Sequence, residues 1–152
     1  MAKVIASFFG TGLILGRVRG SDLGSGTVGG AVAFILAMLI GQQWGWVAVL
    51  VGALVLIVLG LWSARSLVGE NGDAGWIVID EAAGAFIAVV GITTWPVALV
   101  AFAVFRLADI VKGAFPGVAA GERMPGAVGV VADDVVAGLY GLAAGHVIQA
   151  IF

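Results

Sequence analysis

The chain lacks cysteine, has one histidine, and only 11% of its 152 residues are charged. Without cysteine there can be no disulfide framework, no thiolate metal site and no cysteine nucleophile. The net charge of -2 leaves no basic surface that could hold nucleic acid by counterion release. The sequence therefore excludes thiol chemistry, and no nucleic-acid partner is expected.

Apolar residues are abundant instead, at 62% of the chain, with a mean hydropathy of +1.19. A soluble domain of this size does not keep so apolar a composition in water. One helical crossing of a bilayer needs about 20 apolar residues. Residues 23–64 contain no ionisable side chain and are long enough for two crossings. The sequence therefore predicts an all-α integral membrane protein that forms a single domain over residues 1–152.

The expected crossings form two hairpins and one final helix. The sequence GQQWG at 41–45 is the natural turn of the first hairpin, whose short first arm is expected to begin within the glycine-rich stretch before it. The sequence TTWP at 93–96 divides the second hairpin, because proline ends one helix and opens the next. The expected crossings are 27–40, 46–62, 76–92, 96–111 and 127–151.

The N-terminal apolar segment, residues 4–15, is too short to cross a bilayer, so we expect a re-entrant or interfacial helix beside about five crossings. Charged loops alternate along the chain with uncharged hairpin turns. If the connections alternate sides, every lysine and arginine falls on one face, which the positive-inside rule makes cytoplasmic. The charged loops contain Arg17, Arg19 and Asp22; Arg65, Glu70 and Asp73; and Lys112, Glu122 and Arg123.

Acidic residues lie near one end of three expected helices. An ionised side chain at the bilayer centre costs roughly 2.5–3.5 kcal/mol, so acids near one edge are easier to accommodate. On the expected topology these acids and Arg106 meet at the cytoplasmic side and build a pocket from helices distant in sequence. The acids are Asp80 and Glu81, Asp109, and Asp133 and Asp134.

Such a pocket favours metal and phosphate chemistry. Clustered carboxylates repel one another in low dielectric unless a hard divalent cation balances them, and oxygen-only ligands suit Mg²⁺ or Mn²⁺. Arg106 and Lys112 lie three residues on either side of Asp109, and two cations flanking an acid suit a phosphate that also touches metal. The glycine-rich residues 24–30, which include Gly26 and Thr27, open a helix on the same side and could offer backbone N–H groups to an anion.

Four motifs, in this order and at these intervals, resemble the phosphatidylglycerophosphatase A family. They are GTVG at 26–29, IVIDE at 77–81 with Gly84, FRLADIVK at 105–112, and GVVADDVVAG at 129–138. The resemblance implies a multi-pass protein of the bacterial inner membrane, a Mg²⁺-dependent lipid phosphatase that converts phosphatidylglycerophosphate to phosphatidylglycerol and inorganic phosphate. It also implies that Asp80, Glu81, Asp109, Asp133 and Asp134 belong to the site. The chain departs from the family in having Ser25 and Gly113 where proline is usual.

Metal-assisted hydrolysis is then the expected mechanism, with one carboxylate as base and Arg106 meeting the developing charge. Direct attack by a carboxylate is an alternative. The phospholipid would enter sideways from the inner leaflet, with its phosphate near water. His146 lies about 18 Å along the last helix from Asp134 and is given no catalytic role.

Several other interpretations stay open at this stage. The acid pairs could cap their helices, Arg106 and Asp109 could form a purely structural ion pair, and Lys112 could be an anchor that snorkels to the interface. A small ion or proton transporter could use the same carboxylates, although transporters tend to place them near the midplane.

Overall fold

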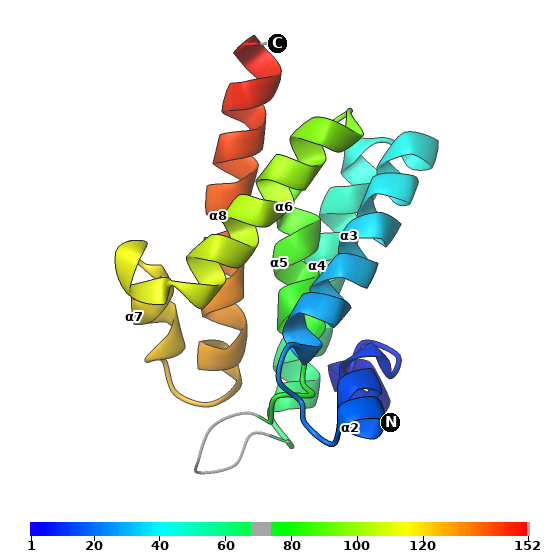
Figure 1. Cartoon of the computed structure of the whole chain (residues 1–152), viewed down its shortest axis with the longest axis vertical. Coiled ribbons are helices and arrows are strands. Elements are labelled where there is room, and N and C mark those ends of the chain that lie inside the picture. Colours follow the sequence, from blue (N-terminus) through cyan, green and yellow to red (C-terminus); the bar gives the residue numbers. More distant parts are fainter. Residues whose placement is uncertain (68–73, 152) are drawn as a thin grey trace.

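The computed structural model describes residues 1–67 and 74–151, and all regular structure within these ranges is helical. The prediction of an all-α chain is confirmed for this part. Two residues of the second charged loop, Glu70 and Asp73, lie outside the described residues. Figure 1 shows the helices arranged side by side, with the N-terminal elements at one end and the C-terminus at the other.

The first hairpin consists of α3 (Ser25–Trp44) and α4 (Trp46–Ala64), and the final helix is α8 (Ala127–Ile151). These three helices are long and apolar enough to cross a membrane. As expected, α3 begins within the glycine-rich stretch. The turn is tighter than the predicted 41–45, because α3 continues to Trp44 and only Gly45, with φ of 79°, separates the two helices. The bounds of α8 agree with the prediction.

The second hairpin consists of α5 (Ile79–Ala88) and α6 (Trp95–Ile110). Helix α5 is shorter than the predicted 76–92, whereas α6 has the predicted length and begins one residue earlier. Ten residues of helix are only about 15 Å long, against a hydrocarbon core of about 30 Å. The prediction of about five crossings is therefore not confirmed. Helix α5 ends at Ala88 with Val89 as its C-cap residue, and the chain then reverses through Gly91, whose φ is 76°.

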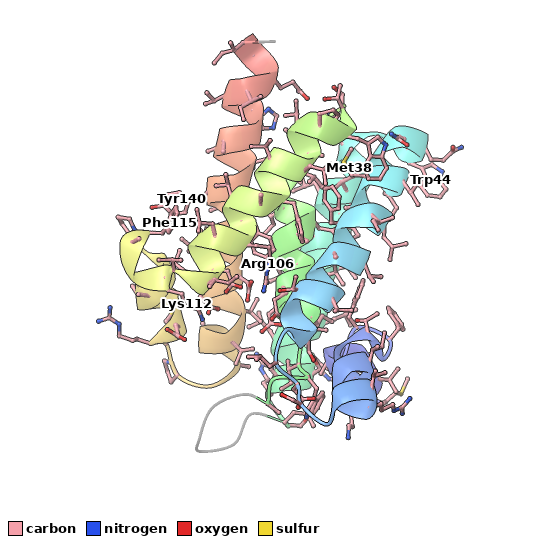
Figure 2. All side chains as sticks on the ribbon, in the orientation of Figure 1. Met38, Trp44, Arg106, Lys112, Phe115 and Tyr140 are labelled. Carbon is pink, nitrogen blue, oxygen red and sulfur yellow. The ribbon has the colours of Figure 1, made fainter. Side chains whose placement is uncertain are left out.

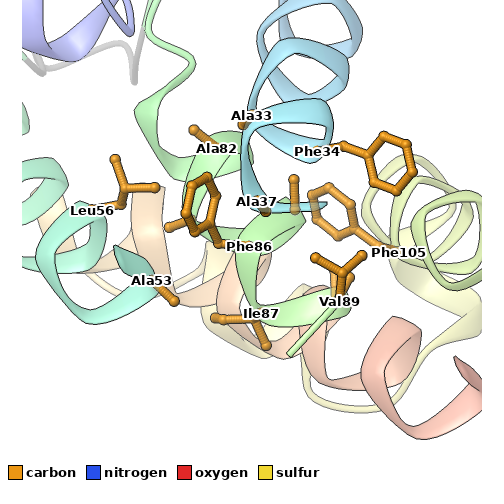
Figure 3. Packing of buried hydrophobic residues seen from close by; sticks show 14 of the residues in the cluster. Ala33, Phe34, Ala37, Ala53, Leu56, Ala82, Phe86, Ile87, Val89 and Phe105 are labelled. Atoms are coloured by element: carbon orange, nitrogen blue, oxygen red, sulfur yellow. The ribbon is translucent and has the colours of Figure 1, made fainter. Parts of the chain in front are cut away.

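Helix α5 occupies the centre of the molecule, because every residue in it except Glu81 is buried. It packs against α3, α4, α6 and α8. Figure 3 shows the Phe86 ring of α5 between Leu56 of α4 and Ala37 of α3. Lipid tails are as apolar as these side chains, so close van der Waals packing, rather than escape from water, holds such helices together.

Small residues bring α5 and α8 into close contact. A Cβ atom on Gly84 would lie 2.5 Å from the Phe105 ring and 2.8 Å from the carbonyl oxygen of Asp134. A Cβ atom on Gly138 would lie 2.7 Å from the carbonyl oxygen of Gly84. Real Cβ atoms do not approach other atoms so closely, so only glycine allows this packing. The contact also brings the first half of α8, with its two aspartates, beside α5.

The N-terminal segment is broken into short pieces: α1 (Ala2–Ala6), the 3-10 turn η1 (Thr11–Leu13) and α2 (Ile14–Arg19). Phe8 and Phe9 interrupt it with positive φ angles of 44° and 56°. The backbone N–H of Val78 donates to the carbonyl of Ala6 at 2.9 Å, which ties this segment to the start of α5. The sequence predicts a single short helix here, whereas the structure has three short helical pieces.

The alternation of the connections also agrees with expectation. The α3–α4 turn, the α5–α6 turn and the C-terminus lie toward one end, while the N-terminal segment and the starts of α3, α5 and α8 lie toward the other (Figure 1). Between α6 and α8 the chain forms the 3-10 turn η2 (Lys112–Ala114) and α7 (Val118–Glu122). Lys112 therefore does not continue the helix that carries Arg106 and Asp109, which corrects the predicted stripe.

Candidate active site

Three helices deliver the acidic residues that the sequence singled out. Asp80 and Glu81 lie in the first turn of α5, Asp109 lies in the last turn of α6, and Asp133 and Asp134 lie in the second turn of α8. Asp80, Asp133 and Asp134 are each 4% exposed, and Asp109 is 9% exposed. Buried carboxylates on three separate helices are costly to place together unless something balances their charge.

The capping interpretation does not account for these acids. The N-cap residue of α5 is Val78, and no side chain caps that helix. The backbone N–H of Glu81 donates to Oδ1 of Asp80 at 3.0 Å, within the first turn. Helix α8 begins at Ala127, well before its aspartates. The helix dipole favours acids in the first turn of α5, but it does not explain burial of the α8 pair.

The carboxylates form two groups that share one member. Ligand oxygens of Asp80, Glu81 and Asp134 lie within 4.8 Å of one another, and so do those of Asp109, Asp133 and Asp134. All five acids predicted for the site therefore meet in one place, with Asp134 in both groups.

Arg106 connects this carboxylate cluster to the start of α3. Its guanidinium lies 2.9 Å from Oδ2 of Asp109, and Nη2 donates to Oγ1 of Thr27 at 3.3 Å. The ion pair considered from the sequence is thus present. Figure 2 shows Arg106 projecting from α6 toward the interior of the helix group. The contact with Thr27 places the cation at the N-terminus of α3 as well, so Arg106 is more than a partner for Asp109.

Lys112 lies on the other side of the carboxylate cluster. Its Nζ donates to Oδ2 of Asp133 at 2.6 Å and to Oε1 of Glu122 at 2.9 Å. Burial disfavours the charged form of Lys112, but the hydrogen bonds and charges of Asp133 and Glu122 outweigh burial and raise the pKa of the ammonium above its usual range. Lys112 therefore stays protonated, and it holds α8 rather than acting as an anchor at the interface.

The segment that carries Lys112 is fixed against α8. The Tyr140 hydroxyl donates to the carbonyl of Pro116 at 2.9 Å, and the Phe115 and Tyr140 rings meet edge to face with centroids 5.1 Å apart. Figure 2 shows both rings and Lys112 between α7 and α8. The sequence carries no signal for the Glu122 contact, because Glu122 lies on a different element from Lys112 and no helical spacing relates the two.

An open pocket of about 560 Å³ lies beside Arg106 at the N-terminus of α3. It is lined by Gly26, Thr27, Glu81 and Arg106, among others. Helix α3 has Gly24 as its N-cap residue and no side-chain cap, so the first-turn N–H groups have no side-chain acceptor. Three of the four predicted phosphate-binding residues thus share one pocket, and the fourth, Lys112, does not line it.

Buried oxygens without a partner show that the protein alone does not complete this cluster. Among the described residues, Oδ1 of Asp133, Oδ1 of Asp134 and Oε2 of Glu81 are buried and accept no hydrogen bond. A buried oxygen that accepts nothing is costly, and three in one cluster call for a ligand. Oxygen donors in closed groups suit Mg²⁺ or Mn²⁺. The residues present therefore fit a divalent cation.

A second pocket, of about 270 Å³, lies at the opposite end around Met38, Trp46 and Ile92. None of its lining residues is charged, so it offers neither an acid nor a cation for phosphate chemistry. His146 also lies at that end, where its Nε2 is 2.9 Å from the carbonyl oxygen of Val90. The histidine is away from the acids, as expected.

Comparison with known proteins decides the family. The sequence model of phosphatidylglycerophosphatase A matches residues 4–149. The chain belongs to this family. Its members are phosphatases, and with three long apolar helices this one is a membrane protein.

Two relatives match over most of their length. A phosphatidylglycerophosphatase A from Haemophilus influenzae is 31% identical over 150 residues, which cover 96% of this chain and 87% of the relative. A Bacteroides thetaiotaomicron protein named "Putative phosphatidylinositol-3-phosphatase" is 34% identical over 147 residues, which cover 90% of this chain and 86% of the relative. No solved structure matches.

Proposed function

We propose that this protein is a Mg²⁺-dependent phosphatase that hydrolyses phosphatidylglycerophosphate to phosphatidylglycerol and inorganic phosphate at the cytoplasmic face of the bacterial inner membrane. The observation that carries the proposal is the juxtaposition of two buried carboxylate groups with the Arg106 pocket. Membership of the phosphatidylglycerophosphatase A family supports the substrate. The positive-inside rule supports the face, because the charged loops share one end with the carboxylates.

The phosphate would bind in the pocket at the start of α3. Arg106 supplies a planar guanidinium that suits phosphate oxygens, and the uncapped N-terminus of α3 supplies backbone N–H groups at Gly26 and Thr27. The ion pair with Asp109 and the contact with Thr27 fix the guanidinium on one side of the pocket. Arg106 would then stabilise the charge that develops as the phosphate is transferred.

Glu81 would take the proton from the attacking water. Alone among the five acids it lines the pocket, and its Oε1 lies against Gly26, while Oε2 is buried without a partner. A carboxylate that reaches both the pocket and the acidic cluster can accept a proton through one oxygen. Mg²⁺, held by the buried carboxylates, would polarise the phosphomonoester and offset its charge.

The open side of the pocket suits a lipid headgroup. A diacyl lipid could enter from the inner leaflet with its phosphate held near water, so soluble glycerol 3-phosphate should be a poor substrate. Hydrolysis of glycerol 3-phosphate as fast as the lipid would contradict this mode of access. The name of the Bacteroides relative favours a second candidate, phosphatidylinositol 3-phosphate, which is also a phosphomonoester on a lipid headgroup.

The test is phosphate release by the detergent-purified protein from each of the two lipids, with Mg²⁺ or with a chelator. We expect release from phosphatidylglycerophosphate that requires Mg²⁺ and is lost in Asp80→Asn and Asp133→Asn. His146→Gln is a matched control, because this polar residue lies on α8 but at the opposite end. Faster release from phosphatidylinositol 3-phosphate would reassign the substrate, and proton flux without any release would favour the transporter.

A further inference from the structure

We infer that the site has two divalent-cation positions bridged by Asp134, and that the ammonium of Lys112 competes with the cation at the second. The inference rests on the proposed function, since it concerns the same carboxylates. It adds the number of ions, their order of binding and a role for a residue outside the phosphate pocket.

The geometry supports two positions rather than one. Asp80, Glu81 and Asp134 form the first group of oxygens, and Asp109, Asp133 and Asp134 form the second. Only Asp134 belongs to both groups. A carboxylate has two oxygens and can bridge two metal ions, which in two-metal sites lie about 3.5–4 Å apart.

Buried oxygens without partners point to a ligand in each group. Oε2 of Glu81 has no partner in the first group, and Oδ1 of Asp133 has none in the second. Oδ1 of the shared Asp134 has none either, although this residue is only 4% exposed. Each of the two groups that share Asp134 therefore contains a buried carboxylate oxygen that accepts no hydrogen bond from the described residues.

The charge balance also favours two cations. Arg106 pairs with Asp109 and Lys112 pairs with Asp133, and the five carboxylates outnumber these two cations. Each divalent cation that binds would offset two negative charges. Two divalent cations would offset four, and the less negative site would attract the phosphate dianion more strongly. Glu122, with a side chain 56% exposed, is largely screened by solvent.

The two positions differ in what the protein supplies. In the second group, Nζ of Lys112 already lies 2.6 Å from Oδ2 of Asp133. The lysine ammonium therefore takes the place that a divalent cation would occupy beside this carboxylate. The ion pairs of Lys112 are with Asp133 and Glu122, whereas Asp80 and Glu81 of the first group lie on α5. The first position should therefore fill at lower metal concentration, and the second should fill only as Lys112 moves toward Glu122.

The experiment is a Mn²⁺ titration of the full-length protein in detergent, followed by electron paramagnetic resonance. Free Mn²⁺ is counted from its six-line signal, and a pair of neighbouring ions is recognised by spin coupling. We expect two ions of unequal affinity in the wild type, and neither in Asp134→Asn. Lys112→Met should tighten the weaker position by about tenfold, because a competing cation is removed. Glu122→Gln should weaken that position, since Lys112 then has only Asp133 as a partner.

Arg123→Met is the matched control. This exposed arginine donates to the carbonyl oxygen of Ala119, so the variant removes a positive charge from the same segment without touching a carboxylate. An equal gain in Arg123→Met and Lys112→Met would overturn direct competition by Lys112. A single Mn²⁺ per chain in both the wild type and Lys112→Met would overturn the second position. Phosphate release from the same sample would, in that case, leave the proposed phosphatase intact.

Discussion

The two ends of the helix group differ in whether their polar groups have hydrogen-bond partners. At the α5–α6 turn, Oε1 of Gln149 accepts from the backbone N–H and the hydroxyl of Thr93, and Nε2 of Gln149 donates to the carbonyl of Gly91. At the carboxylate end, Oε2 of Glu81 and the Oδ1 atoms of Asp133 and Asp134 are buried and accept no hydrogen bond from the described residues. Hydrogen-bonded polar groups stabilise a turn. Buried carboxylate oxygens without a partner lower stability, and a protein retains them where a ligand binds.

The largest effect that would sharpen this comparison is expected from Asp134→Asn. Its amide cannot bridge cations, so phosphate release should fall on the order of 10³-fold. Stability should not fall with it, because the change removes a buried charge whose Oδ1 has no protein partner. Phosphate release and thermal unfolding by circular dichroism would measure the two effects. A clear drop in melting temperature would mean that Asp134 is structural.

A change at the α5–α8 contact should damage both properties at once. In Gly84→Ala the new methyl group would meet the Phe105 ring and the carbonyl oxygen of Asp134, and overpacking of this kind costs about 1–3 kcal/mol. Because the contact displaces the Asp134 backbone, activity should fall as well. Thermal unfolding and phosphate release would show it. Gly113→Ala is the control, since its Cβ would meet nothing within 4 Å. Equal stability of the two variants would refute the tight contact.

The smallest effect is expected at the opposite end. Gln149→Ala removes the hydrogen bonds to Thr93 and Gly91, which should cost about 1 kcal/mol of unfolding free energy and leave phosphate release unchanged. The measurement is the midpoint of chemical unfolding in detergent, beside a rate assay at saturating lipid. Loss of activity without loss of stability in Gln149→Ala would contradict the view that the α5–α6 turn serves stability and the carboxylate end serves catalysis.

Helix ends were predictable wherever the sequence carries a local signal. Gly45 and the Thr93–Pro96 stretch mark their turns, and α8 has the predicted bounds. The ends of α5 carry weaker signals, because Val78 and Val89 are apolar residues within an apolar run. Gly91 was the available sign that the chain reverses there, since its φ of 76° is easy only for glycine.

The clustering of the five acids could be predicted from the sequence, because helix lengths and the alternation of charged and uncharged loops fix which helix ends lie at the same side. The partners of Lys112 could not, because they depend on how η2 and α7 fold back on α8. A helix continued to Lys112 was the simplest expectation, but α6 ends at Ile110, and the turn that follows directs the lysine to Asp133 and Glu122. Short irregular segments of this kind carry no periodicity from which their contacts can be read.

The enclosure of α5 has a consequence for biosynthesis. This helix is only 10 residues long and is buried against helices on both sides of it in the sequence, so it has no stable place in a bilayer until α8 arrives. Because α8 also brings Asp133 and Asp134, the nascent chain gathers its acids only after α8 has left the ribosome. An incomplete chain would hold part of the carboxylate cluster but neither of its two groups, and so would be inert toward lipid while it is still being made.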